Sequence, residues 1–181
     1  MKKVHLKGTD FNFSIIDTIG DGSCLLHSII YSSCKKYRNM SESEKIEYVK
    51  NLRKHLSVLF NEGKNYSYLS RGEISEISNF LPAMKKENMK LYMNSNKWLN
   101  IFFLEYISNL LNLDIFIINQ NRQELYQTGD KEIYIKGRDS VVINYIDNLH
   151  FESAGLESNG KIITLFHRDS PVIKKLKKLY K

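Results

Sequence analysis

The sequence GDGSCLLHS, residues 20–28, joins a glycine-bearing turn to the start of an apolar segment. Ser23 is a residue type that often precedes the first turn of a helix, and Leu25 and Ile29 fall on one helical face after it. We therefore expect a turn over residues 20–23 and a helix that begins at about Cys24 and runs to residue 36.

Helices are expected in the first part of the chain and strands in the second. Ser41 and Glu44 have the spacing of a capping box, and apolar residues three or four apart follow them. Residues 85–96 are polar and irregular, so no element is expected there. The expected helices cover 24–36, 43–61, 74–81 and 98–111, and the expected strands cover 114–119, 132–136, 141–146, 150–153 and 161–166. Residues 11–19 alternate loosely and are interpreted as a short strand or an extended lead-in. This order is typical of the α+β class, in which helices cover a sheet.

The composition indicates one globular domain over residues 1–181. The chain is 42% hydrophobic and 26% charged, and it has neither repeats nor a long flexible linker. Its first twenty residues lack the apolar run of a signal peptide. The apolar segment Ile101–Ile118 carries Glu105 and Asp114, which are costly in lipid, so we interpret it as a buried helix followed by a core strand. A soluble, cytoplasmic monomer is expected.

The net charge of +7 is concentrated at the C-terminal end. Five of the nine residues in the segment 173–181 are lysine, and we interpret this segment as a solvated end of the domain. The alternative is a nucleic-acid contact, but the chain contains no recognisable reader motif, so binding to nucleic acid is not expected. Abundant Lys, Asn and Ile are typical of AT-rich genomes, such as those of large viruses and intracellular bacteria.

The two cysteines, Cys24 and Cys34, form neither a disulfide framework nor a zinc-binding pattern. They fit a reducing compartment, in which a free thiol can serve in catalysis. We interpret Cys34 as structural, and no metal or cofactor is expected.

Cys24 is the candidate nucleophile. A helix N-terminus favours the reactive thiolate, because its unpaired amides and the helix dipole stabilise negative charge. The preceding turn can direct the backbone N–H groups of Gly22, Ser23 and Cys24 towards one point, where a tetrahedral oxyanion could lie. The alternative is that Cys24 is only a small buried residue at a helix start.

His150 is the candidate base. It begins a predicted strand, and Asn148 and Glu152 lie two residues to either side, so either side chain can share its face of the strand and orient the imidazole. The other histidines are less well placed for this role: His5, His27, His55 and His167.

Three segments together resemble the ovarian-tumour (OTU) family of cysteine proteases. Residues 21–28 resemble the family's Asp-Gly-x-Cys-Leu nucleophile motif, and residues 148–152 resemble its C-terminal histidine motif. Between them, residues 98–118 are similar to the family's middle block, which has a tryptophan, an apolar helix and a core strand. The resemblance spans residues 11–166, although Leu99 and Phe103 stand where the family pattern leads us to expect Gly and Glu. Trp98 itself we interpret as a core residue.

The resemblance implies a papain-like OTU fold, with a central, mostly antiparallel sheet flanked by helices. It also implies hydrolysis of isopeptide or peptide bonds at the C-terminus of ubiquitin, polyubiquitin or a ubiquitin-like protein. In the family pattern Cys24 attacks, His150 acts as base, and Gly22 and Ser23 belong to the oxyanion loop. Glu152 stands where the family usually has Asn or Asp to orient the histidine. Asp21 matches the aspartate that shapes the oxyanion loop and is in some members the third catalytic residue.

Of these two carboxylates, we favour Glu152 as the direct partner of His150. The alternatives to a deubiquitinating protease are an OTU-fold module that binds ubiquitin without cleaving it, a basic nucleic-acid-binding protein and another papain-like hydrolase.

Overall fold

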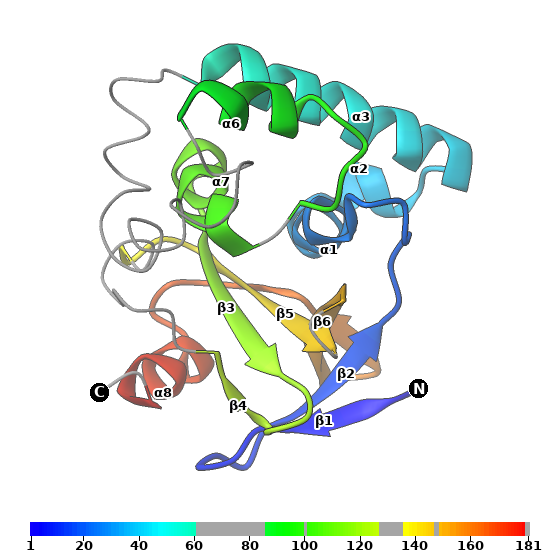
Figure 1. Cartoon of the computed structure of the whole chain (residues 1–181). Coiled ribbons are helices and arrows are strands. Elements are labelled where there is room, and N and C mark those ends of the chain that lie inside the picture. Colours follow the sequence, from blue (N-terminus) through cyan, green and yellow to red (C-terminus); the bar gives the residue numbers. More distant parts are fainter. Residues whose placement is uncertain (61–85, 100, 127–135, 147–148, 180–181) are drawn as a thin grey trace.

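The computed structural model of the protein describes residues 1–60, 86–99, 101–126, 136–146 and 149–179. Within this part of the chain, a twisted sheet lies between a larger layer of helices on one face and a single C-terminal helix on the other (Figure 1). The larger layer contains α1 (Cys24–Ser33), α2 (Lys35–Arg38), α3 (Glu42–Leu59), α6 (Lys86–Met93) and α7 (Leu104–Leu111). The C-terminal helix is α8 (Pro171–Leu179).

The sheet runs in the order β1-β2-β6-β5-β3-β4, with β7 paired to β6 and β8 paired to β5. Among the strands that the structure describes, all pairs are antiparallel except β3 with β5, which are parallel. The strands are β1 (Lys3–His5), β2 (Asn12–Ile16), β3 (Asp114–Asn119), β4 (Glu124–Leu125), β5 (Ser140–Ile146), β6 (His150–Ser158), β7 (Lys161–Ile163) and β8 (Leu165–Phe166). The sheet is therefore mostly antiparallel, as expected.

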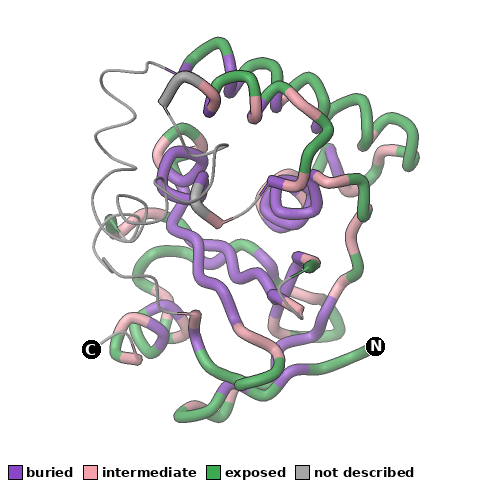
Figure 2. Tube along the Cα trace, viewed as in Figure 1, coloured by how far each residue is buried: buried purple, intermediate pink, exposed green. Residues whose placement is uncertain are grey.

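Both faces of the central strands are buried (Figure 2). Successive side chains of a strand point to opposite faces, so Ile115 and Ile117 of β3 join the core under the helical layer, while Phe116 and Ile118 join a second core on the other face. The continuous apolar run that the sequence shows here follows from this two-sided burial.

The nucleophile turn and the capping box have the local structures that the sequence predicts. Helix α1 begins at Cys24 after Ser23, and helix α3 begins after Ser41, whose side chain accepts from the Glu44 amide while Glu44 binds back to the Ser41 amide. A buried hydrogen bond of 2.6 Å joins the hydroxyl groups of Ser32 on α1 and Ser153 on β6. It links the helical layer directly to the sheet.

Four sequence expectations were wrong in detail. The expected helix 24–36 is interrupted at Cys34, whose backbone is extended, so α1 ends at Ser33 and α2 begins at Lys35. In the described part of the expected helix 98–111 there is a 3₁₀ turn, η2 (Ile101–Phe103), and then α7, so Trp98 lies in irregular structure before them. The polar segment 85–96 contains helix α6, whose Met89 and Met93 are buried. The expected strand 161–166 is divided into β7 and β8, because Thr164 turns inward between them and binds the Ser32 carbonyl. The expected helix 74–81 lies outside the described residues, as does most of the expected strand 132–136.

The lysine-rich end is not only a solvated tail. Residues 171–179 form α8, and Ile173 and Leu176 are fully buried in the second core, beneath the sheet. Lys174, Lys175 and Lys178 are exposed on its outer side. The interpretation of a solvated end is therefore correct for these lysines and wrong for the apolar face that they accompany. Within the described part of the chain, no helix has the length and apolarity needed to cross a membrane.

Candidate active site

Cys24 is the first residue of α1, and its side chain is only 2% exposed. Burial raises the pKa of the Cys24 thiol, against the opposite effect of nearby donors: the Phe151 amide, the Trp98 indole and the Leu25 amide. The donors expected at a helix N-terminus are present, yet desolvation outweighs them in the free protein. The thiol is therefore neutral at neutral pH and needs a base before it can react.

The turn before Cys24 has no room for a side chain at position 22. Gly22 has φ of +86°, and a Cβ atom at this position would lie 2.6 Å from the carbonyl oxygen of Asn96. The left-handed conformation and the close approach of residue 96 both require glycine here. The segment that carries Trp98 is thus packed directly on the nucleophile turn.

Asp21 is held by hydrogen bonds within its own part of the chain. One carboxylate oxygen accepts from the Ser23 amide at 2.9 Å, and the other lies 3.1 Å from Nε2 of His27. Nδ1 of His27 lies 2.5 Å from the Tyr37 hydroxyl, and burial lowers the pKa of His27. A neutral His27 that donates from Nε2 to Asp21 and accepts from Tyr37 at Nδ1 satisfies all these groups. Asp21 therefore fixes the shape of the turn.

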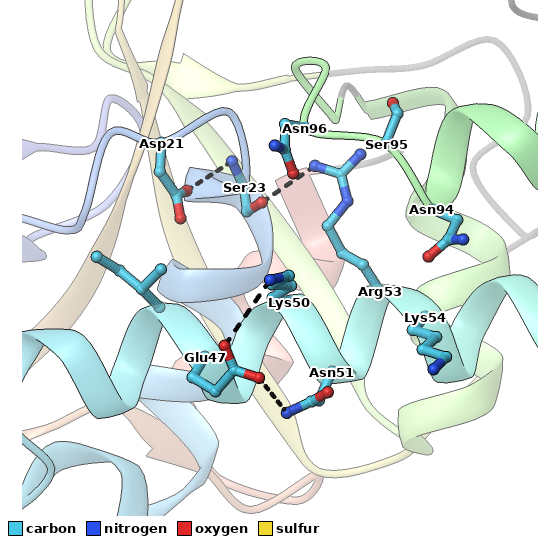
Figure 3. A pocket seen from close by; sticks show the side chains of 11 residues that line it. Asp21, Ser23, Glu47, Lys50, Asn51, Arg53, Lys54, Asn94, Ser95 and Asn96 are labelled. Carbon is cyan, nitrogen blue, oxygen red and sulfur yellow. Dashed lines mark hydrogen bonds and ion pairs between the residues drawn. The ribbon is translucent and has the colours of Figure 1, made fainter.

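Arg53 was not identified from the sequence, and it holds the same turn from helix α3 (Figure 3). Its side chain is 4% exposed. It donates to the Gly22 carbonyl at 3.3 Å and to the Ser23 hydroxyl at 3.0 Å. Three further bonds reach the carbonyl oxygens of Met93, Lys97 and Tyr92. One guanidinium thus joins α3, the nucleophile turn and the segment 92–97, along the wall of a pocket of about 560 Å³.

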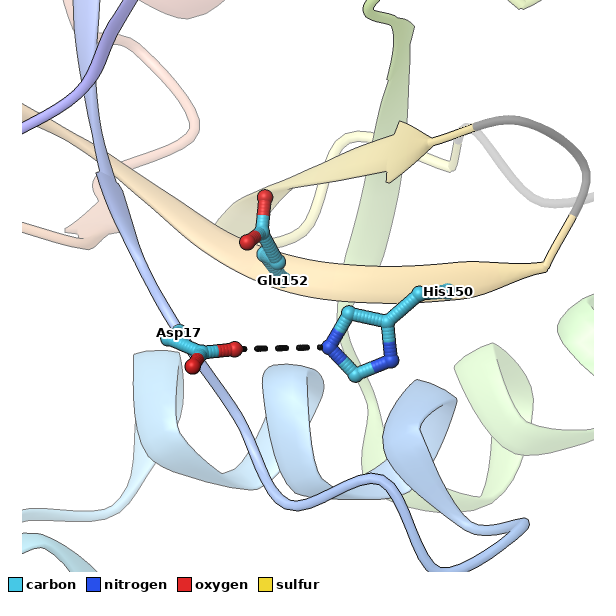
Figure 4. Close-up of side chains that lie close together, drawn as sticks. All are labelled: Asp17, His150 and Glu152. Carbon is cyan, nitrogen blue, oxygen red and sulfur yellow. Dashed lines mark ion pairs between the residues drawn. The ribbon is translucent and has the colours of Figure 1, made fainter.

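His150 begins β6 and lies beside Asp17, which follows β2 (Figure 4). The distance from His150 Nε2 to Asp17 Oδ1 is 3.5 Å. The strand register explains this approach: β2 and β6 are antiparallel with Ile16 opposite Ser153, so Asp17 comes alongside Glu152. A Cβ atom on Gly20 would lie 3.8 Å from Cε1 of His150, which places the start of the nucleophile turn against the imidazole.

Glu152 is buried, and it accepts a hydrogen bond of 2.9 Å from Nδ2 of Asn144, its partner across β5 and β6. Its carboxylate also belongs to the His150 cluster: one ligand atom each from Asp17, His150 and Glu152 lie within 4.8 Å of one another. Among the described residues this is the one cluster with ligand atoms close enough together to hold a metal ion. Asp17 was not identified from the sequence, because only strand pairing brings it to His150.

The structure brings the predicted nucleophile and the predicted base to the same place. The backbone of Phe151, next to His150 in β6, lies close enough to the Cys24 thiol to lower its pKa, and the Phe151 ring stacks on Trp98 at 5.9 Å. Cys34 lies at the far end of α1 and is partly buried, away from this cluster. A thiol at a helix N-terminus, an imidazole at the start of a neighbouring strand and a carboxylate beside that imidazole are the groups that acyl transfer by a cysteine nucleophile requires.

Comparison with protein families gives a match to the OTU-like cysteine proteases over residues 19–152, which is well over half of the chain. The chain belongs to this family. The match begins just before the nucleophile turn of this OTU-like protease and ends at Glu152, so it contains both Cys24 and His150. Comparison with curated protein sequences gives no match.

One solved structure supports the OTU fold, and two further matches are weaker. A structure titled as an OTU domain in complex with ubiquitin is 16% identical, covers 99% of this chain and 91% of that chain, and superposes with a TM-score of 0.57. An OTU deubiquitinase from Wolbachia pipientis wMel is 14% identical, with coverage of 94% and 98% and a TM-score of 0.46. A viral OTU domain protease from Farallon virus is 17% identical, with coverage of 87% and 90% and a TM-score of 0.45. The α+β fold expected for this OTU-like protease is confirmed.

Proposed function

We propose that this OTU-like protease hydrolyses the isopeptide or peptide bond at the C-terminus of ubiquitin or a ubiquitin-like protein. The observation that carries the proposal is the placement of Cys24 at the start of α1, next to the strand that begins with His150. The family match covers both residues, and the fold is that of an OTU domain solved with ubiquitin bound. Ubiquitin or polyubiquitin is therefore the proposed partner.

The proposed reaction uses both nitrogens of His150. Nε2 faces Asp17, which leaves Nδ1 to take the proton from the Cys24 thiol. The sulfur then attacks the carbonyl carbon of the terminal glycine of the modifier, and the imidazolium returns the proton to the departing amine. Water, deprotonated by the same imidazole, hydrolyses the thioester and releases the carboxylate of the modifier.

The oxyanion of each tetrahedral intermediate is proposed to lie against the turn before Cys24. Three backbone amides were expected to face it, but the Ser23 amide already donates to Asp21. The proposed donors are therefore the amides of Gly22 and Cys24. Asp21, His27 and Arg53 hold this loop in shape, so no rearrangement of the turn is needed when the charge forms.

Reaction with a ubiquitin that carries an electrophilic C-terminal group tests the proposal. Wild-type protein and Cys34→Ala are expected to form a covalent adduct of one ubiquitin mass, and Cys24→Ala is expected to form none, which intact-mass spectrometry reads directly. Ubiquitin-like proteins with the same reactive group, tested in parallel, identify the preferred modifier. Absence of an adduct in the wild type, or an adduct that persists in Cys24→Ala, would contradict the proposed function.

A further inference from the structure

The indole N–H of Trp98 is buried and has no hydrogen-bond partner among the described residues. A buried tryptophan N–H usually finds an acceptor, because leaving it unpaired costs the desolvation of a donor. The sequence suggested a core role for Trp98, and the ring does pack against the core under the helical layer. That role explains the ring but leaves the unpaired N–H unexplained.

The ring of Trp98 is fixed, so the N–H cannot easily turn to another acceptor. The ring stacks on Phe151 with an interplanar angle of 13°, and Phe151 stacks in turn on Tyr145 at 4.5 Å. The backbone on either side is also held. The Trp98 carbonyl accepts from the Tyr92 hydroxyl at 2.6 Å, and the Leu99 amide donates to the Gly22 carbonyl at 2.9 Å.

The fixed N–H belongs to a ring that packs against the core cluster containing Cys24, and the next residue, Leu99, is bonded to Gly22 of the nucleophile turn. The N–H does not form a full hydrogen bond to the neutral thiol, yet its position favours the anion and acts to lower the pKa of Cys24. A thiol sulfur is a weak acceptor, whereas a thiolate accepts strongly. The donor therefore gains a good acceptor only when negative charge is present on the sulfur.

We propose that Trp98 is a further catalytic residue of this protease, whose fixed indole N–H stabilises the negative charge on the Cys24 sulfur during acyl transfer. The charge is present twice in each cycle: when the thiol loses its proton to His150, and when the sulfur leaves the acyl group in the hydrolysis step. Stabilisation that is stronger in the charged states than in the resting thiol lowers the barrier. The inference rests on the proposed role of Cys24 as the nucleophile.

Trp98→Phe tests this role, because phenylalanine keeps a ring to stack on Phe151 and removes the N–H. Both the variant and its control carry Cys34→Ala, so that Cys24 is the only thiol. The rate of alkylation by iodoacetamide is measured from pH 7 to 11.5, and kcat/KM is measured on a ubiquitin–fluorophore substrate. We expect the midpoint of the alkylation profile to move to higher pH by about one unit or more. We expect kcat to fall about 10- to 100-fold with KM little changed, as for loss of a hydrogen bond to a charged group.

A benzothienyl-alanine at position 98, which replaces the N–H by sulfur in a ring of nearly the same shape, serves if Trp98→Phe does not fold. Thermal melting shows whether either variant is folded. An unchanged alkylation midpoint in a folded variant would overturn the proposal. Alkylation needs no ubiquitin, so it tests the role of Trp98 even if the protein does not cleave ubiquitin. Failure of the proposed function would appear as absent ubiquitin cleavage, whereas failure of the proposal for Trp98 would appear as an unchanged alkylation midpoint.

Discussion

Oδ1 of Asp17 lies 3.5 Å from Nε2 of His150, so the imidazole faces a carboxylate that stands seven residues before the nucleophile in the chain. Glu152 stands at the position where the family usually has Asn or Asp, and its carboxylate accepts a hydrogen bond of 2.9 Å from Nδ2 of Asn144. Both carboxylates are close enough to bias the orientation of His150.

Asp17→Ala is expected to lower kcat/KM about tenfold, because the imidazole loses the group that faces Nε2. The Asp17 side chain is 87% exposed, so its interaction with His150 is screened by salt. The loss should therefore be larger at 20 mM salt than at 500 mM salt. Glu152→Gln keeps an oxygen for Asn144 and is the matched comparison, with a smaller expected loss. An inactive Glu152→Gln beside a fully active Asp17→Ala would instead make Glu152 the orienting residue, as the family position suggests.

Arg53→Lys is expected to lower both stability and turnover, although it conserves the charge. A lysine has a single donor centre and cannot reach the oxygens of Gly22, Ser23 and Met93 together, so buried acceptors lose their partners. We expect a loss of about 2–4 kcal/mol in the free energy of unfolding, measured in urea, and a lower kcat. His55→Gln, on an exposed position of the same helix, serves as control. Wild-type stability in Arg53→Lys would show that the bonds of the guanidinium are dispensable.

Helix α8 should contribute to stability through its apolar face and not through its lysines. Ile173→Ala or Leu176→Ala leaves a cavity in the second core, and each is expected to cost about 2–4 kcal/mol in urea unfolding. Lys174→Gln and Lys175→Gln, on the exposed side, are expected to change stability by less than about 0.5 kcal/mol. Equal effects of the two kinds of substitution would contradict the docked helix.

His27 should make the fold sensitive to mild acid. Burial lowers the pKa of His27 in the folded protein, so the unfolded chain binds a proton at a higher pH than the folded chain does. The stabilising contribution is therefore complete above pH 6.5 and is lost as the pH falls from 6.5 through the lowered folded pKa. Urea unfolding from pH 8 to pH 5 should show this decline in the wild type and in His55→Gln. The decline should be reduced in His27→Gln, and an equal slope in all three proteins would exclude His27 as the cause.

The parts of the fold that the sequence predicted are those that depend on local pattern. Helix α1 starting at Cys24, the capping box at Ser41 and the buried strand at 114–119 each follow from residue types within a few positions of one another. Helix α6 was missed because its apolar contacts, Met89 and Met93, are few and stand among polar residues. Ile173 and Leu176 of α8 have the spacing of a helical apolar face, but they stand among lysines, and a lysine-rich segment is also typical of a solvated end.

Residues that depend on tertiary contacts were beyond this kind of prediction. Asp17 reaches His150 only through the register of β2 against β6. Arg53 has a recognisable sequence signal: it stands four residues after Val49 and three before Leu56, on the buried face of α3, where an arginine is unusual. Trp98 was assigned correctly to the core, but its unpaired N–H is a property of the folded site.

The hydrogen bond between Ser32 and Ser153 fixes the position of α1 along β6. The thiol belongs to the helical layer and the imidazole to the sheet, so their separation depends on how far α1 can slide along β6. Apolar surfaces permit small slippage with little change in energy, whereas two buried hydroxyl groups in contact at 2.6 Å do not. The bond lies eight residues from Cys24 along α1 and three from His150 along β6, so it holds α1 against β6 close to the proposed nucleophile and the proposed base.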